Sequence, residues 1–135
     1  MGHKLVLLVE DDINLRQSIL LILQRAGLLI TATDDVCEAL EILGSGKYQL
    51  VISDLDVPGA PNVLLPKIHG NHPNLPVLIL TDQSIAEIKK EEKSIHAHYL
   101  NKPVDPECIL DCVDDILGKN GLTTRLKDGF SRPAA

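Results

Sequence analysis

The chain has 135 residues, which is enough for one domain with a hydrophobic core. Apolar residues make up 44% of it, but the aromatic ones are two tyrosines and one phenylalanine, so leucine, isoleucine and valine must build the interior. The net charge of -6 argues against a general nucleic-acid binder, whose surface would be basic. No apolar run is long enough to span a membrane, and charge appears too early for a signal peptide, so we expect a cytoplasmic protein.

The first half of the chain alternates between apolar runs and segments with helical periodicity. Residues 4–9 form a continuous apolar run, typical of a strand that is covered on both faces. Residues 13–27 have helical spacing and end at Gly27, a residue suited to a helix C-terminus. A second strand at 28–33 and a second helix at 34–46 follow in the same order.

The second half continues this alternation. Residues 48–54 predict a third strand, and residues 61–69 predict at best a short helix, because Pro66 interrupts the segment. Asp105 is suited to the N-cap of the last helix, and Pro106 to its first position. The remaining expected elements are a strand at 74–82, a polar helix at 84–97, a strand at 98–101 and a helix at 105–118.

Strands and helices in this order predict an α/β fold, in which a parallel sheet carries helices on both faces. We assign residues 1–118 to this domain. Residues 119–135 lack periodicity and end in small residues and proline, so we interpret them as a flexible tail or the start of a linker.

Polar and charged residues follow four of the predicted strands. In a parallel sheet the carboxyl ends of the strands meet at one edge, where ligands bind. Two carboxylates about 4 Å apart repel by roughly 4 kcal/mol at an effective dielectric constant near 20, so a positive partner is expected. Carboxylates suit Mg²⁺ and also serve as phosphoryl acceptors, and an ammonium and a hydroxyl can bind phosphoryl oxygens. The residues concerned are Glu10, Asp11, Asp12, Asp54, Asp56, Thr81, Asp82 and Lys102.

Residues 4–118 resemble the receiver domain of two-component response regulators. Four motifs carry the resemblance, each at the end of its own predicted strand: "LLVEDD", "VISDLDVPG", "LILT" and "YLNKP". No single motif is specific, but the four in this order are. The resemblance implies a doubly wound, flavodoxin-like fold with five parallel strands in the order 2-1-3-4-5.

By resemblance, Asp54 is the phosphoacceptor. The implied Mg²⁺ site consists of Asp54, Asp11, the backbone carbonyl of Asp56, and Glu10 acting through a water molecule. Mg²⁺ is the cofactor that this site implies.

The resemblance also assigns residues to the phosphoryl group and to the switch. Lys102 pairs with Asp54 and later with phosphoryl oxygens, and Pro103 follows a cis peptide bond. Thr81 turns its hydroxyl toward the phosphoryl group, and Tyr99 turns inward behind it. The face formed by residues 84–97, 98–101 and 105–118 then changes as a two-state switch.

The implied function is two-component signal transduction by Mg²⁺-dependent phosphorylation. The phosphoryl donor is a sensor histidine kinase or a phosphotransfer protein. The domain catalyses only its own phosphorylation and dephosphorylation, so it is not an enzyme with a separate substrate. An output domain C-terminal to this chain and a phosphorylation-linked homodimer are further expectations, whereas contact of this domain with nucleic acid or a membrane is not expected.

Some positions depart from the family pattern. Asp82 stands where the family has a small residue beside the phosphoryl group, and its carboxylate could repel that group. Asp56 places a further acid two positions after Asp54, where it could alter the lifetime of the phosphoryl group. Ile95 and His96 replace the usual Gly-Ala pair before Tyr99.

Several residues also have simpler interpretations. Asp12 is better explained as the N-cap of the first helix than as a ligand, and Asp56 could be only a turn residue. The segment Gly44-Ser45-Gly46-Lys47 follows a helix and lacks the spacing of a phosphate-binding loop.

Two alternative functions remain open at this point. One is a phosphatase of the haloacid-dehalogenase type, suggested by Asp54-Leu55-Asp56 after a strand, although the order of motifs and the chain length disagree with it. The other is a receiver-like binding module that never uses phosphate, which Asp82 favours.

Overall fold

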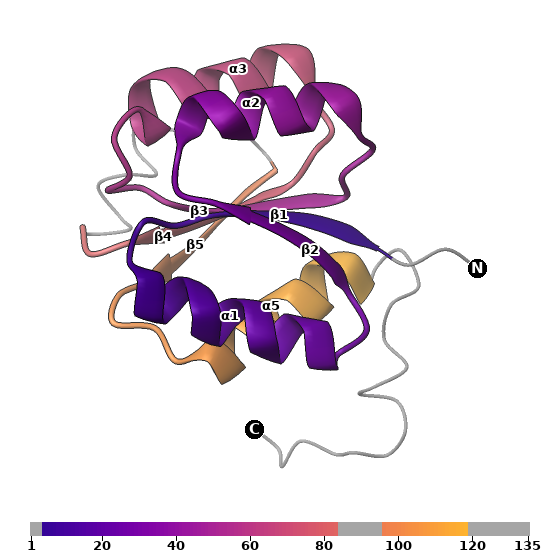
Figure 1. Cartoon of the computed structure of the whole chain (residues 1–135), viewed down its shortest axis with the longest axis vertical. Coiled ribbons are helices and arrows are strands. Elements are labelled where there is room, and N and C mark those ends of the chain that lie inside the picture. The colour runs from indigo at the N-terminus through magenta and orange to yellow at the C-terminus, as the bar shows by residue number, and fades with distance from the viewer. Residues whose placement is uncertain (1–3, 84–95, 119–135) are drawn as a thin grey trace.

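The computed structural model describes residues 4–83 and 96–118, and its centre is a parallel sheet of five strands in the order β2-β1-β3-β4-β5 (Figure 1). This order confirms the expected doubly wound, flavodoxin-like arrangement. The three inner strands are almost completely buried, which explains why each reads as an unbroken apolar run. The strands are β1 (Leu5–Val9), β2 (Leu29–Thr33), β3 (Leu50–Asp54), β4 (Val77–Thr81) and β5 (Ala97–Asn101).

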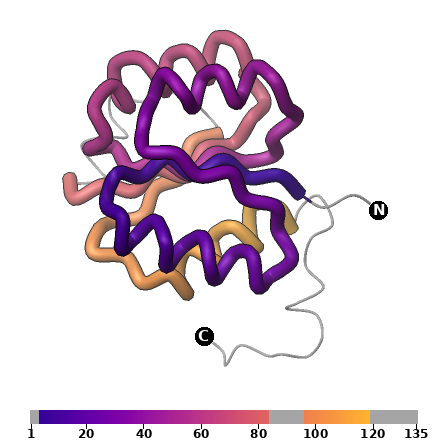
Figure 2. The backbone as a smooth tube through the Cα atoms, viewed as in Figure 1, coloured from indigo at the N-terminus to yellow at the C-terminus, as the bar shows by residue number. Residues whose placement is uncertain are grey.

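Helices cover both faces of the sheet, as the alternating pattern predicts (Figures 1 and 2). One face carries α1 (Ile13–Arg25) and α5 (Pro106–Gly118). The other face carries α2 (Val36–Ser45) and α3 (Leu65–Asn71), with the π-helical turn η1 (Ala60–Leu64) leading into α3.

Two hydrophobic clusters hold these layers together, one on each face of the sheet. Successive residues of a strand point to opposite faces, so Val6 and Leu8 of β1 belong to the cluster under α1 and α5. Leu7 and Val9 of the same strand belong to the cluster under α2 and α3. The sheet thereby fixes the positions of its loops, including those at its carboxyl edge.

Local signals at helix ends are observed where the sequence predicts them. The Asp12 carboxylate caps α1 by accepting hydrogen bonds from the backbone N–H groups of Asn14 and Leu15. Gly27 follows the end of α1 with φ +92°, a conformation that favours glycine. The Asp105 carboxylate accepts a hydrogen bond from the N–H of Glu107, and α5 begins at Pro106.

The prediction that Pro66 interrupts a helix is wrong. Helical structure runs from Ala60 to Asn71, and Pro66 lies in the first turn of α3, directly after the π-helical turn. An N–H in the first turn of an α-helix has no partner within the helix, so proline is tolerated there.

Two expectations fall wholly or partly on residues outside the described ranges. The helix expected at 84–97 lies there except for its end, and that end is wrong, because Ala97 already belongs to β5. The tail or linker expected at 119–135 lies entirely outside the described residues. Among the helices that the structure does describe, none has the length and apolarity needed to span a membrane.

Candidate functional site

The carboxyl edge of the sheet brings the predicted site residues together. Glu10 directly follows β1, Asp54 ends β3, Thr81 ends β4 and Lys102 directly follows β5. These four strands are neighbours, so their ends converge on one crevice. Glu10, Asp54 and Thr81 are all buried there.

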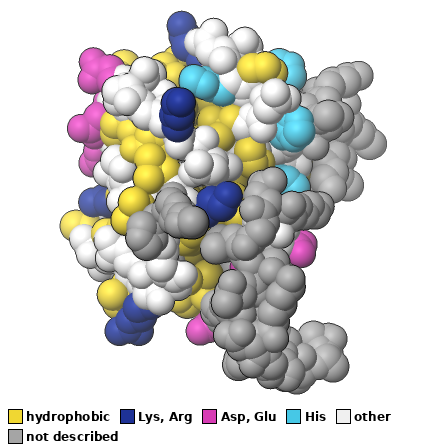
Figure 3. All heavy atoms as spheres, turned by 90° about the vertical axis from the view of Figure 1, so that its right-hand side faces the viewer, with side chains coloured by type: hydrophobic (Ala, Val, Ile, Leu, Met, Phe, Trp, Pro, Cys, Tyr) yellow, Lys and Arg dark blue, Asp and Glu magenta, His cyan; other side chains and the backbone are white. Residues whose placement is uncertain are grey.

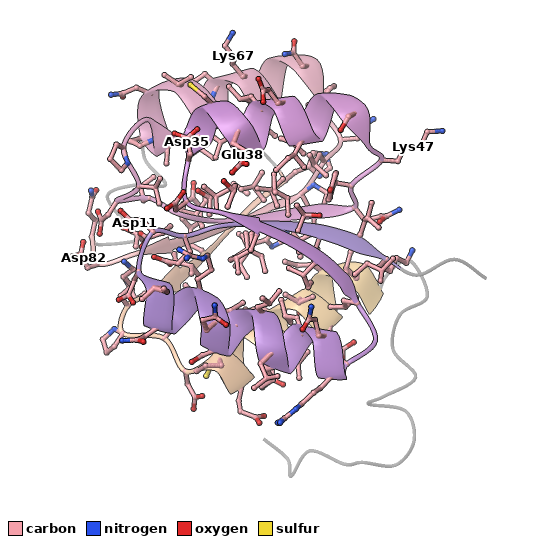
Figure 4. All side chains as sticks on the ribbon, in the orientation of Figure 1. Asp11, Asp35, Glu38, Lys47, Lys67 and Asp82 are labelled. Atoms are coloured by element: carbon pink, nitrogen blue, oxygen red, sulfur yellow. The ribbon has the colours of Figure 1, made fainter. Side chains whose placement is uncertain are left out.

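Three carboxylates form an acidic cluster in this crevice. One carboxylate oxygen from each of Glu10, Asp11 and Asp54 lies within 4.8 Å of the other two. Glu10 and Asp54 are buried, whereas Asp11 is exposed at the same edge (Figure 4). Hard oxygen ligands in such an arrangement suit Mg²⁺.

Glu10 is the electrostatically strained member of this cluster. Its Oε2 accepts a hydrogen bond from the N–H of Asp12 (3.1 Å), but its buried Oε1 has no hydrogen-bond donor. Burial, assisted by the nearby Asp54, raises the pKa of Glu10 to about 7 against the lowering effects of the Asp12 N–H and Lys102. A divalent cation would supply the positive partner that Oε1 lacks, so these residues fit the metal that the sequence implies.

Asp54 is paired with Lys102. The Lys102 Nζ atom lies 2.5 Å from Asp54 Oδ2 and 3.5 Å from Asp56 Oδ2. Burial lowers the pKa of Lys102, but the hydrogen bond and charge of Asp54, with the charges of Glu10 and Asp56, raise it by more. The ammonium therefore stays charged at neutral pH, and the peptide bond that joins Lys102 to Pro103 is cis, as expected.

Asp56 is in contact with the site, whereas Asp82 is exposed outside the acidic cluster. The Asp56 N–H donates to Asp54 Oδ1 (2.9 Å), and its carboxylate faces Lys102, so Asp56 is more than a turn residue. Asp82 is exposed, and Figure 4 shows it at the same edge as Asp11. It does not belong to the group of described acids that is close enough to share a cation.

The two expected switch residues lie on neighbouring strands of the sheet, with Thr81 at the end of β4 and Tyr99 on β5. Thr81 is fully buried, and its Oγ1 accepts a hydrogen bond from the N–H of Gln83 (3.0 Å). Tyr99 is half-buried on β5 and lines a pocket of about 580 Å³ together with Gln83 and Asp56.

The side of the molecule that lies away from Asp11 and Asp82 has no central group of acidic side chains among the described residues that are visible in Figure 3. Figure 3 looks at that side, where the visible acidic side chains of the described residues lie toward the margins. Lys47 projects on that side, away from Asp11 and Asp82 (Figure 4). The Gly44–Lys47 segment is therefore remote from the acidic crevice, in agreement with its interpretation as a helix end and turn.

Two residues that support the site were missed by the sequence analysis. Arg16 Nη1 donates to the carbonyl of Glu10 (2.9 Å), and the Asn101 side chain donates to the carbonyls of Thr81 and Gln83. Both act on backbone atoms, which a sequence does not display. The only available signal was that Asn101 directly precedes Lys102 at the end of a strand.

Fold and site together define a class: a doubly wound α/β domain with a buried aspartate, an acidic cluster and a paired lysine at the carboxyl edge of its sheet. A family model of the response regulator receiver domain matches residues 6–114. The chain belongs to this family, the receiver domains of two-component signal transduction. The haloacid-dehalogenase alternative is thereby rejected.

Individual relatives agree with this assignment. The response regulator protein FleR of Pseudomonas aeruginosa is 37% identical over 110 residues, which are 80% of this chain and 23% of FleR. The transcriptional regulatory protein GlrR of Escherichia coli is 32% identical over 128 residues, 92% of this chain and 29% of GlrR. The chain thus spans about a quarter of the length of these relatives.

A solved structure shows the same fold. The chemotaxis protein CheY4 of Vibrio cholerae superimposes with a TM-score of 0.76 at 29% identity. The match covers 86% of this chain and 100% of the CheY4 chain.

Proposed function

We propose that this domain accepts a phosphoryl group on Asp54 in a Mg²⁺-dependent reaction, from a histidine kinase or a phosphotransfer protein. The observation that supports this most strongly is the ion pair of buried Asp54 with Lys102, directly beside an acidic cluster whose Glu10 Oε1 has no hydrogen-bond donor. This arrangement places the Lys102 ammonium on one side of the Asp54 carboxylate and, on the other side, a group of carboxylates that can hold a cation.

The residues that would hold Mg²⁺ are Asp11, Asp54 and the backbone carbonyl of Asp56, with Glu10 acting through a water molecule. When bound, the ion neutralises the negative charge that otherwise keeps a phosphoryl donor away from Asp54. Asp11 is exposed and Glu10 is buried, so the cluster has a side that solvent can reach.

Lys102 and Asp54 carry out the transfer. An Asp54 carboxylate oxygen attacks the phosphorus of the donor phosphohistidine, a P–O bond forms, the P–N bond breaks, and the electron pair of that bond remains on the histidine nitrogen. The Lys102 ammonium, 2.5 Å from Asp54 Oδ2, offsets the charge of the incoming oxygens without changing its own protonation. Hydrolysis of the acyl phosphate later restores Asp54.

Thr81 and Tyr99 transmit the change. The phosphoryl oxygens recruit the Thr81 hydroxyl, which gives up its bond with Gln83, and Tyr99 moves inward behind it. The expected output face includes β5 and α5, and its remaining part, the expected helix at 84–97, lies almost entirely outside the described residues.

The wider role is also a proposal. The domain catalyses only its own phosphorylation and dephosphorylation, and it passes the signal to an output domain or to a second copy of itself. Two relatives are named as a response regulator and a transcriptional regulatory protein, and each is much longer than this chain. The cytoplasmic location expected from the sequence stays a prediction.

Intact mass spectrometry after incubation with acetyl phosphate tests this function. We expect a gain of one phosphoryl group that requires Mg²⁺ and is absent from Asp54→Asn. The variant keeps the shape of the side chain but loses the nucleophilic carboxylate. Asp82→Asn is the matched control, because it removes an acid from the same edge without touching the acidic cluster.

Three outcomes would contradict the proposal. A phosphoryl gain that persists in Asp54→Asn would mean that another residue is the acceptor. No gain in the wild-type chain with any donor or divalent metal would favour the phosphate-independent binding module. A gain that appears only in Asp82→Asn would show that Asp82 closes the site.

A further inference from the structure

The side chain of Asn101 connects two strand ends beside the site. Asn101 is the last residue of β5 and is exposed. Its Nδ2 atom donates to the backbone carbonyl of Thr81 (3.2 Å) and to that of Gln83 (2.8 Å). The two hydrogens of one amide nitrogen therefore bind both ends of the three-residue segment 81–83, which we call the 81–83 turn.

The 81–83 turn also determines where the Thr81 hydroxyl lies. Thr81 Oγ1 accepts a hydrogen bond from the N–H of Gln83 (3.0 Å), a local turn typical of threonine. The N–H of Lys102 donates to the same Thr81 carbonyl that Asn101 binds (2.7 Å). In this conformation the hydroxyl is therefore engaged within its own turn.

We propose that Asn101 is a positioning residue that stabilises this resting conformation and so sets how easily the switch responds. The inference rests on the proposed function, in which the Thr81 hydroxyl leaves Gln83 for the phosphoryl group. That movement must change the 81–83 turn, and a changed turn loses the spacing of carbonyls that Asn101 bridges. Asn101 thus favours the state that binds phosphate less well.

The carboxamide at position 101 suits the two carbonyls that it binds. Both partners are carbonyl oxygens, so the side chain must supply two donors, which asparagine does and leucine does not. Each such bond contributes modestly in an exposed position. We therefore expect an effect of about fivefold on the equilibrium between the two conformations, enough to tune a switch but not to prevent it.

The test is calorimetric titration of the full chain with beryllofluoride, a phosphoryl mimic, in the presence of Mg²⁺. The apparent affinity for a ligand of the minor state falls with the population of that state. Asn101→Leu should therefore bind about fivefold more tightly than the wild type. Asn71→Leu makes the same chemical change at another exposed position, at the end of α3, and should leave the affinity unchanged.

Repeating the substitution in a Thr81→Val protein tests whether Asn101 acts by positioning the Thr81 hydroxyl or by a general structural effect. In Thr81→Val there is no hydroxyl to recruit, so Asn101→Leu should no longer change the affinity. A shift of equal size in both backgrounds would overturn the proposal, because Asn101 would then act through Lys102 or through overall stability. Hydrogen exchange of the Gln83 amide in the absence of ligand should also be faster in Asn101→Leu, and unchanged exchange would equally overturn it.

The experiment distinguishes failure of this inference from failure of the proposed function. If the wild type binds beryllofluoride, Asp54→Asn does not, and Asn101→Leu matches the wild type, only the role of Asn101 is overturned. If the wild type does not bind beryllofluoride with Mg²⁺, the phosphorylation switch is overturned and the role of Asn101 with it. Thermal unfolding of each variant shows whether it is folded. If Asn101→Leu is not folded, Asn101→Ala provides a second variant.

Discussion

At the scale of single residues, the site is organised around a carboxylate in an unfavourable environment. Glu10 is fully buried, and one of its oxygens has no hydrogen-bond donor. A buried charge without a full set of partners is costly, and the group responds by holding its proton more tightly. The site is thus ready for a cation rather than stable without one.

The raised pKa of Glu10 predicts how stability depends on pH in the absence of metal. Burial, with the charge of Asp54, raises this pKa from 4.5 to about 7. The stability contributed by neutral Glu10 is fully present below pH 4.5 and is lost as the pH rises through about 7. Glu10→Gln stays neutral, so between pH 4.5 and 7 the wild type should lose up to about 3 kcal/mol relative to this variant.

Urea unfolding of both proteins at pH 4.5 and pH 8, with a chelator present, measures this difference. Comparison with Glu10→Gln removes the contributions of the titrating groups that do not interact with Glu10. A free-energy difference that does not change with pH would mean that Glu10 is charged in the folded protein.

The sequence predicted some of these residues and not others, for a physical reason. Asp54 and Lys102 could be placed because each stands at the end of a predicted strand, and strand ends of a parallel sheet meet at one edge. Asn101 could not, because its partners are the carbonyls of Thr81 and Gln83, which any residue type would provide. The contact of Asp56 with Lys102 likewise depends on how the turn after β3 folds.

At the scale of elements, helix ends were predictable where the signal is local. Asp12 and Gly27 act within one turn of α1, so their roles follow from sequence alone. Pro66 differs, because proline breaks a helix in its middle and begins one in its first turn. The outcome depended on the π-helical turn from Ala60 to Leu64, which no local pattern indicated.

Two glycines at helix ends should respond in opposite ways to replacement by alanine. Gly44 lies inside α2 with open space around it and a helical conformation, so Gly44→Ala should stabilise the fold by about 0.5–1 kcal/mol. Gly27 also has open space, but its φ of +92° is unfavourable for a side chain, so Gly27→Ala should destabilise by about 1–2 kcal/mol.

Chemical denaturation of the two variants beside the wild type measures both changes. Since neither added Cβ meets a neighbouring atom within 4 Å, the pair isolates backbone conformation from packing. Equal effects of the same sign would contradict the conformational argument and point to the unfolded state as the common cause.

At the scale of the whole molecule, the layered architecture follows from the apolar runs, and the strand order does not. A strand buried on both faces needs helices above and below it, which is what the two clusters on opposite faces of the sheet provide. Periodicity is the same for any permutation of the strands, so the order 2-1-3-4-5 came from the family resemblance. The edge strands β2 and β5 are less buried, as their position requires.

The acidic cluster joins two distant segments of the chain, so a cation bound there should stabilise the entire fold. Glu10 and Asp11 follow β1, whereas Asp54 ends β3, and unfolding separates them. A ligand that binds only the folded state adds about 1.4 kcal/mol for each tenfold rise in its concentration above Kd. Unfolding measured against Mg²⁺ concentration, at constant ionic strength, should show this slope for the wild type.

Two substitutions decide whether that stabilisation comes from the cluster or from general screening of the net charge of -6. Asp11→Asn weakens one proposed ligand, so the same slope should begin only at higher Mg²⁺ concentration. Asp82→Asn removes an equal charge from the same edge but outside the cluster, and it should behave like the wild type. If both variants need the same higher Mg²⁺ concentration before stabilisation begins, Mg²⁺ only screens the acidic edge, and the proposed metal site would have to be abandoned.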